Sequence, residues 1–142
     1  MTEPEPIKDD RPGSNDSAKA YEVGQVWKYH SRDYESGSHL YIVRIDEHED
    51  YGEIFHIVID RIALKNPFIE GGVQDVLPHA PVSRRALDES VTNLLGISNQ
   101  LPDITEEYLV WRKDFDKGEG GVFEISAAEI ITCIEDVAAR NA

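Results

Sequence analysis

Side chains suited to acid–base chemistry stand inside a strand-like run, GEIFHIVIDRI, at residues 52–62. His56 and Asp60 fall on one face of such a strand, because side chains alternate between its two faces. Four residues at about 3.3 Å each separate them by roughly 13 Å, too far for a direct hydrogen bond. Asp46 or His30 from a neighbouring strand could approach His56 instead. Without a G-x-S-x-G, Walker A or G-x-G-x-x-G motif, the sequence favours a non-enzymatic protein with no catalytic residues and no cofactor.

A second group of candidate residues lies in PHAPVSRRAL, residues 78–87. Arg84 and Arg85 fall in the first turn of an expected helix, where the helix dipole disfavours cations. With Ser83, His79 and free helix N–H groups, they could clamp a phosphate or a carboxylate. The alternative is that both arginines pair with the acidic surface around them.

The histidines and the cysteine do not predict a metal site. The chain has five histidines in no H-x-H or H-E-x-x-H spacing, and one cysteine. A single cysteine excludes an internal disulfide and is typical of a reducing compartment, so we expect a cytoplasmic protein. Cys133 falls in the apolar stripe of the last expected helix, and we expect it to be buried.

The charge is strongly negative along the whole chain. The formal net charge of −14 divides into about −2 for residues 1–20, −6 for residues 21–82 and −6 for residues 83–142. Such a surface repels nucleic acid and anionic lipid, and no apolar run is long enough to span a bilayer. It would attract a basic protein, although high charge also simply keeps a protein soluble.

The pattern along the chain predicts a disordered polar tail over residues 1–20 and a single domain over residues 21–142. Strand-like runs cover residues 26–30, 39–47 and 52–64, joined by short loops that favour an antiparallel meander. Residues 66–82 contain three prolines and two adjacent glycines, which predict an irregular crossing segment.

Helical periodicity follows these strands. Ser83 is a good N-cap for a helix through Leu95, and Ser126 with Glu129 forms a capping box for the last helix. Between them, a helix that begins near Asp103 carries three aromatic residues on one face: Tyr108, Trp111 and Phe115. The sequence therefore predicts an α+β fold, a small antiparallel sheet of three to four strands with about three C-terminal helices packed on one face.

One face of the predicted sheet mixes ionisable with aliphatic side chains. The ionisable residues are Lys28, His30, Arg44, Asp46, His56 and Asp60, and the aliphatic residues are Leu40, Ile42, Ile54 and Val58. A half-covered face fits this mixture, with residues 66–82, a second copy of the chain or another protein as the cover. The alternative is a solvent face with cross-strand pairs such as Arg44 with Asp60, or Asp46 with Lys28.

Three stretches, GQVWKYHSRDYESGSHLYIVRI, PHAPVSRRALDESV and YLVWRKDFDKGEGGVFEIS, resemble small bacterial proteins of unassigned function. The resemblance covers most of residues 21–140. It implies a bacterial single-domain protein and no particular activity.

These observations favour an acidic protein-binding domain whose mixed sheet face or acidic helices engage a partner. The most concrete version is an immunity or antitoxin protein that neutralises a basic toxin, because charge complementarity speeds and directs such encounters. One alternative is an anion binder or enzyme that uses His79, Ser83, Arg84 and Arg85. Another is a homodimer that forms through the mixed sheet face.

Overall fold

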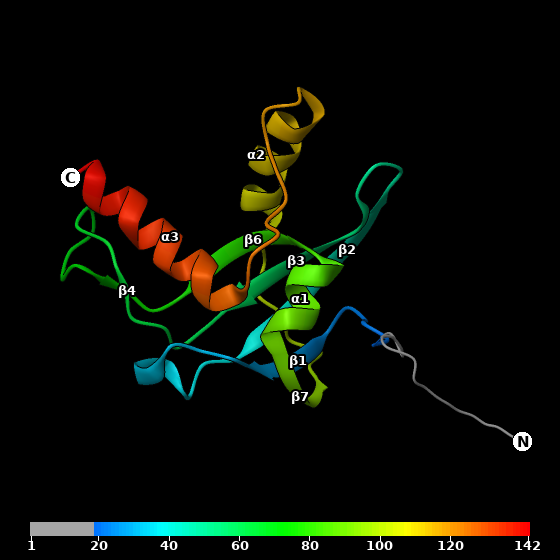
Figure 1. Cartoon of the computed structure of the whole chain (residues 1–142), viewed down its shortest axis with the longest axis horizontal. Coiled ribbons are helices and arrows are strands. Elements are labelled where there is room, and N and C mark those ends of the chain that lie inside the picture. Colours follow the sequence, from blue (N-terminus) through cyan, green and yellow to red (C-terminus); the bar gives the residue numbers. More distant parts are fainter. Residues whose placement is uncertain (1–18) are drawn as a thin grey trace, which may run out of the picture.

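The computed structural model describes residues 19–142, so the predicted tail lies almost wholly outside the described residues. Most strands come first along this part of the chain, and the two longest helices come last (Figure 1). In chain order they are β1 (Gln25–Tyr29), a 3-10 turn (Asp33–Glu35), β2 (Leu40–His48), β3 (Gly52–Ile59), β4 (Leu64–Lys65), β5 (Val73–Gln74), β6 (Leu77–Ser83), α1 (Arg84–Ser90), β7 (Val91–Ile97), α2 (Thr105–Asp116) and α3 (Ala127–Arg140).

Five strands form one antiparallel sheet in the order β6-β3-β2-β1-β7, and β4 pairs with β5 in a separate ribbon. The α+β class is confirmed, with five strands in the main sheet where the sequence predicts three to four. The predicted meander of β1, β2 and β3 is present. Gly52 closes the β2–β3 hairpin with a φ of 72°, a left-handed conformation that glycine adopts without strain.

The two strands that the sequence does not predict, β6 and β7, lie at the edges of the sheet. Pro78 and Pro81 suggested an irregular segment, but an edge strand tolerates proline because one side of its backbone needs no ladder partner. The predicted helix through Leu95 ends at Ser90, and the chain continues as β7. The leucine spacing there fits a helix, but Val91 pairs with Tyr29 of β1, so tertiary pairing overrides the local preference.

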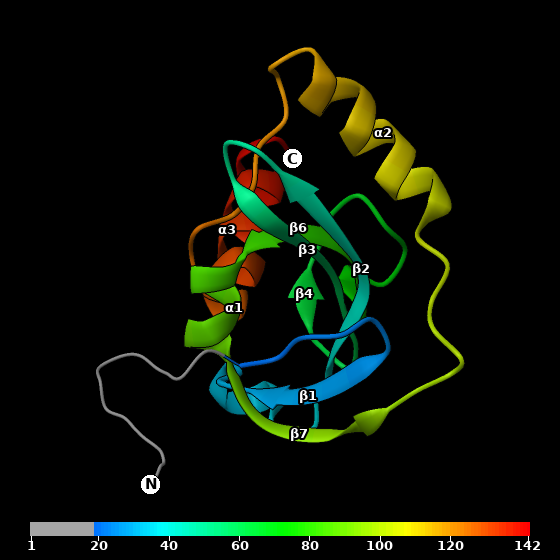
Figure 2. The ribbon, with the colours of Figure 1, turned by 90° about the vertical axis from the view of Figure 1, so that its right-hand side faces the viewer.

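Helices α1 and α3 cover one face of the sheet (Figure 2). This face carries the alternate residues of β1 and β3 that the sequence assigns to the apolar side, and they are buried. The core that they form with the two helices comprises, among others, Trp27, Tyr29, Leu40, Ile42, Phe55, Ile57, Ile59, Leu87, Ile130 and Ile131. Cys133 is exposed instead of buried, because α3 turns Ile130 and Ile131 toward the core and Cys133 away from it.

Helix α2 lies on the opposite side of the sheet from α1 and α3 (Figure 2), so the predicted placement of all helices on one face is wrong. The side chains of Tyr108 and Trp111 pack against His56 in the middle of the sheet. Phe115 packs against His48 and Tyr51 at the tip of the β2–β3 hairpin. The mixed sheet face is therefore covered in part by the chain's own aromatic helix, an arrangement that the sequence did not suggest.

A charged clamp ties α3 to the rest of the domain. The Arg32 guanidinium donates to the carboxylates of Glu35, at 2.6 and 2.8 Å, and of Glu135, at 2.7 Å. Glu35 is buried and also accepts the backbone N–H of Ala63 at 2.7 Å. Because every charge in the clamp has a partner, its burial is compatible with a stable fold. No helix among residues 19–142 is long and apolar enough to cross a membrane.

Candidate functional site

Two irregularities in the sheet aim ionisable side chains toward His56. The pairing of β2 with β3 shifts between Ile42 and Arg44, and the pairing of β3 with β6 shifts between Ile57 and Ile59. Each shift inserts an extra residue into the strand beside β3, and such bulges re-aim the side chains that follow. The first bulge leaves Ile42 in the core and turns Arg44 to the same face as His56.

The same bulge corrects the predicted composition of the mixed face. The sequence places Leu40 and Ile42 on it because strict alternation links them to Arg44. In the structure both residues are fully buried in the core, opposite Ile59 and Ile57. Alternation restarts after the bulge, and a bulge leaves no composition signal of its own, so this error could not be avoided from sequence.

A hydrogen-bonded chain of three side chains runs across the neighbouring strands β2, β3 and β6. Nε2 of His56 lies 2.9 Å from Oδ2 of Asp46, and Nδ1 of His56 lies 2.9 Å from Nε2 of His79. The expectation that Asp46 approaches His56 across the strands is thus confirmed. The Nε group of Arg44 donates to the other carboxylate oxygen of Asp46 at 3.0 Å. Arg44, Asp46, His56 and His79 therefore form one connected network.

The network assigns the histidine tautomers. An ionised carboxylate only accepts hydrogen bonds, so His56 must donate from Nε2 to Asp46. Its Nδ1 is then unprotonated and accepts the N–H of His79 Nε2. This leaves Nδ1 of His79 as an acceptor at the end of the chain. The planes of the two rings differ by 10°, so the hydrogen bond can lie close to both ring planes.

Both histidines are held neutral near pH 7. Burial, and next the neighbouring His79, lower the pKa of His56 to about 4, against the opposing attraction of Asp46. Burial also lowers the pKa of His79, while Glu107 acts in the opposite direction. The ring of His56 is fully buried. The two histidines can therefore order hydrogen bonds without adding positive charge to this side of the sheet.

Aromatic side chains of α2 enclose the network. The ring centres of Trp111 and Tyr108 lie 4.9 and 5.1 Å from that of His56, both in edge-on geometry. The guanidinium carbon of Arg44 lies 4.0 Å from the centre of the Tyr108 ring, which the ring face stabilises. The indole N–H of Trp111 donates to the carbonyl of Gly121 at 2.9 Å. These contacts fix α2 over the histidines.

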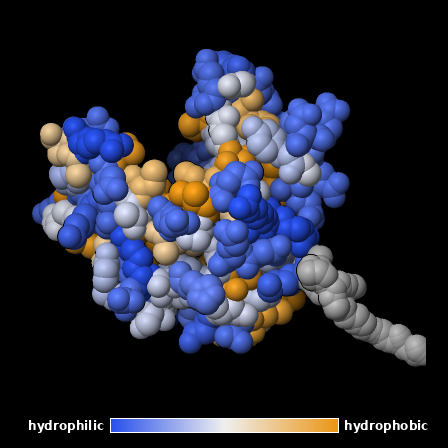
Figure 3. Space-filling model, viewed as in Figure 1, coloured by the Kyte–Doolittle hydropathy of each residue, from blue (hydrophilic) through white to orange (hydrophobic). Residues whose placement is uncertain are grey.

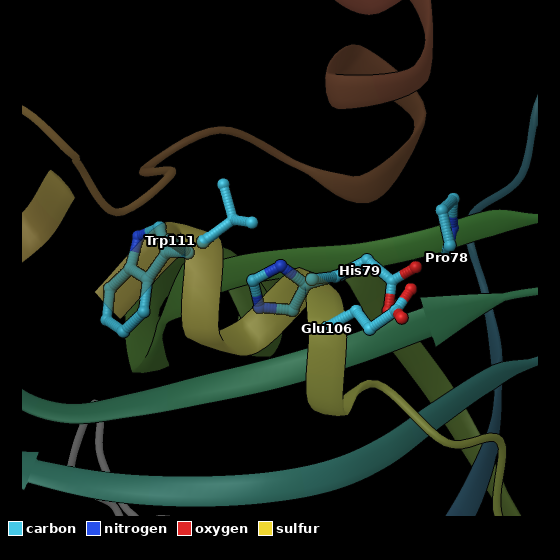
Figure 4. A pocket seen from close by; sticks show the side chains of 6 residues that line it. Pro78, His79, Glu106 and Trp111 are labelled. Atoms are coloured by element: carbon cyan, nitrogen blue, oxygen red, sulfur yellow. The ribbon is translucent and has the colours of Figure 1, made fainter. Parts of the chain in front are cut away.

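A pocket of about 490 Å³ opens where α2 meets β6, beside the end of the network (Figure 4). Its lining residues are Pro78, His79, Glu106, Glu107, Val110 and Trp111. Figure 4 shows the His79 ring between Trp111 and Glu106. The pocket thus combines two carboxylates, an indole and a neutral imidazole, and its lining contains no serine, threonine or cysteine that could serve as a nucleophile.

Trp111 also forms a wall of a second, apolar pocket of about 370 Å³. Its other lining residues are Pro81, Gly121, Val122 and Phe123. Figure 3 shows the surface hollowed between α2 and α3, with hydrophobic residues at the base of the hollow. An acidic pocket and an apolar pocket therefore share one indole.

Two further predicted residues lie away from the network. The side chain of His30 is exposed just after β1. Asp60 follows β3, where it accepts hydrogen bonds from the backbone N–H of His39 at 2.8 Å and from the hydroxyl of Tyr41 at 2.9 Å. The cross-strand pair of Arg44 with Asp60 is not formed, because each has another partner. Asp60 therefore has a local structural role, and His30 takes no part in the network.

The four residues of the candidate anion clamp do not converge on one site. Arg84 pairs with Glu53 at 2.8 Å, and Arg85 lies near Glu89 at 3.4 Å. Ser83 donates to Glu124 and accepts the N–H of Ala86, as a helix N-cap. His79 lies at the other end of β6, roughly 13 Å from Ser83 at the usual rise per residue. The arginines pair with the acidic surface, as in the alternative considered above.

Sequence reasoning did not single out Glu106, Glu107 and Trp111 as binding residues. A signal was present, since Glu107 and Trp111 are four residues apart and therefore share a helix face. What the sequence lacked was the position of α2 relative to His79. Comparison with family models, with curated proteins and with solved structures finds no match to this chain. The geometry of the site therefore carries the functional argument alone.

Proposed function

We propose that this protein is a non-enzymatic binding domain for a basic protein partner, and that the pocket between α2 and β6 receives a lysine or arginine side chain of that partner. The most concrete form is an immunity or antitoxin protein that neutralises a basic toxin. The observation that carries the proposal is the pocket itself, which sets two carboxylates and an indole together on a chain of net charge −14.

The pocket suits a cation in three ways. The carboxylates of Glu106 and Glu107 supply charge-assisted acceptors for an ammonium or guanidinium group. Trp111 supplies an aromatic wall, and Trp is the ring that attracts cations most strongly. His79 is neutral near pH 7, so it does not repel an incoming positive charge.

The acidic surface and the apolar pocket support the same partner class. A net charge of −14 raises the encounter rate with a basic protein and disfavours acidic ones. The apolar pocket on the other side of Trp111 would accept a hydrophobic residue beside the basic one. A central anchor in a pocket next to an apolar contact is the usual form of a binding hot spot.

A pair of matched variants tests the proposal. Glu106→Gln with Glu107→Gln removes both pocket carboxylates, and Glu89→Gln with Asp136→Asn removes two exposed carboxylates on α1 and α3, across the sheet. The wild type and the two variants would be used as bait on native lysate at low salt, and bound proteins would be eluted by a salt gradient. In parallel, each would be titrated with a fluorescent arginine-rich peptide.

We expect the wild type and the control variant to retain the same basic protein and to bind the peptide equally. The pocket variant should lose the basic protein and bind the peptide at least about tenfold more weakly, which corresponds to about 1.4 kcal/mol. Binding should weaken as salt rises. Equal binding by the pocket and control variants would show that the pocket does not recognise cations, and the proposal would be abandoned.

A further inference from the structure

The two edges of the five-stranded sheet differ in how they are protected. The β6 edge contains Pro78 and Pro81. The segment around Phe123 lies beside this edge, where Phe123 forms a parallel bridge with Val82. Phe123 donates to the carbonyl of Pro81 at 2.8 Å, and its own carbonyl accepts the N–H of Ser83 at 3.0 Å. Prolines and a covering segment are common devices that prevent pairing with another sheet. The β6 edge is therefore closed.

The β7 edge has neither a proline within the strand nor a covering segment among residues 19–142, although its pairing with β1 is shifted at two points. It ends the strand order, and among residues 19–142 no strand pairs with its outer side (Figure 2). Residues 91–102, VTNLLGISNQLP, contain no Asp, Glu, Lys or Arg, although 30% of the chain is charged. Edge strands of soluble proteins usually carry a charge, above all lysine, that opposes association. The open edge is thus also the uncharged one.

Large aliphatic side chains of β7 face solvent. Leu94 and Leu95 are each 48% exposed, and Ile97 is 66% exposed. Figure 3 shows hydrophobic residues at the lower rim of the molecule, where β7 runs in Figure 1. These three residues make residues 94–97 an exposed apolar strip, on a strand that pairs with β1 on one side and has no partner on its outer side among residues 19–142. Exposed apolar strips of this kind mark association sites.

We infer that β7 is a self-association surface, at which two copies of this chain pair their β7 strands antiparallel about a twofold axis and join their sheets. The distribution of charge indicates which molecule binds at the β7 edge. A basic partner would gain no electrostatic attraction from an uncharged strip. A second copy, which also carries −14, can approach only where neither copy presents charge, and residues 91–102 meet that condition.

Because the β6 edge is closed, association through the sheet edges stops at two copies of the chain. Pairing of β7 with β6 of the next copy would be head-to-tail and would grow into a fibre, but the prolines and the covering segment block β6. Pairing of β7 with β7 uses the same strand from both copies and is complete at two. The structure therefore leads to a closed dimer, formed away from the pocket at α2.

Sedimentation of the full chain from about 1 µM to about 300 µM tests the inference, because small interfaces associate in this range. We expect the mass to rise from 16.0 kDa toward twice that value. Leu95→Lys with Ile97→Lys should raise the dissociation constant at least about thirtyfold. The control, Leu109→Lys with Val137→Lys, makes the same change at exposed aliphatic residues of α2 and α3 and should dimerise normally.

The salt dependence separates this dimer from the complex with a basic partner. High salt screens the repulsion between two acidic copies and should strengthen the dimer, whereas it should weaken a complex with a basic protein. A wild-type protein that stays monomeric at the highest concentration in both low and high salt would overturn the inference. So would a folded Leu95→Lys/Ile97→Lys variant that dimerises like the wild type.

A second measurement decides the matter if that variant fails to fold. Single cysteines would be placed in turn at residues 92–97 in a Cys133→Ser background, since Cys133 is exposed and would form disulfides itself. Antiparallel pairing brings one of these positions close to its own copy, within the distance that a disulfide needs. We expect at least one covalent dimer and none from Leu109→Cys. Absence of any cross-link from residues 92–97 would overturn the inference.

Discussion

The buried histidine of the network makes the stability of the fold depend on pH in a predictable direction. Burial holds the pKa of His56 at about 4 in the folded protein, against an ordinary value of 6.5. Above about pH 6.5 the ring is neutral in both states and the full stability is present. As the pH falls below 6.5, the unfolded chain takes up a proton that the folded protein accepts only near pH 4. Stability is therefore lost between these two values.

The magnitude follows from the same two pKa values. At about 1.4 kcal/mol for each pH unit, the whole difference lowers the free energy of unfolding by about 3 kcal/mol. About 2 kcal/mol of this is already lost near pH 5, above the range in which most carboxylates titrate. Since a typical domain is stable by only about 5–15 kcal/mol, this loss is large enough to measure.

Urea denaturation of wild type and His56→Gln across the range from about pH 7.5 to pH 5 measures this loss. Glutamine can still donate to Asp46 and accept from His79, but it does not titrate. We expect the wild type to lose about 2 kcal/mol more than His56→Gln over this range. His30→Gln, which removes an exposed histidine, should behave as wild type. Parallel profiles for wild type and His56→Gln, or an NMR pKa of His56 near 6.5, would refute this reasoning.

Two other substitutions test the charged clamp around Arg32 and the packing of α2 against the sheet. Glu35→Gln leaves the half-buried Arg32 with one carboxylate fewer and should lower the free energy of unfolding by about 3 kcal/mol in urea at pH 7. Asp33→Asn, on an exposed neighbour, should change it by less than about 0.5 kcal/mol. Trp111→Ala removes the indole between α2 and the histidines, and we expect faster amide hydrogen exchange over residues 105–116 with β3 still protected. Leu109→Ala, on the exposed side of α2, serves as its control, and equal exchange in both variants would contradict the role of Trp111.

The parts of the fold that the sequence predicted correctly are those governed by local rules. Alternation in β1, β2 and β3 identified three strands, and capping signals identified the start of α3, where Ser126 and Glu129 form the capping box. The helical spacing of Tyr108, Trp111 and Phe115 predicted that they share a helix face. Each of these features depends on residues close together in the chain.

The errors concern features that depend on distant residues. The bulge at Arg44 reassigned Leu40 and Ile42 to the core, and only the pairing of β2 with β3 reveals it. The strand β6 escaped detection because proline argues against a strand unless that strand lies at an edge, and edge position is a property of the whole sheet. For the same reason His56 could be recognised as unusual, while its second partner, His79, could not be predicted.

The position of α2 links the network to the pocket. No side chain of α2 is fully buried, and the helix is held chiefly by aromatic contacts with the histidines and with the hairpin tip. Such an element belongs to the low-stability end of a domain, where local opening costs less than global unfolding. Yet the pocket exists only while α2 stays docked, because two of its walls, Pro78 and His79, belong to β6 and the others to α2. A cationic partner that fills the pocket must therefore stabilise the docked helix by the free energy of its own binding. The neutral histidines beneath the helix add no positive charge that would repel this partner.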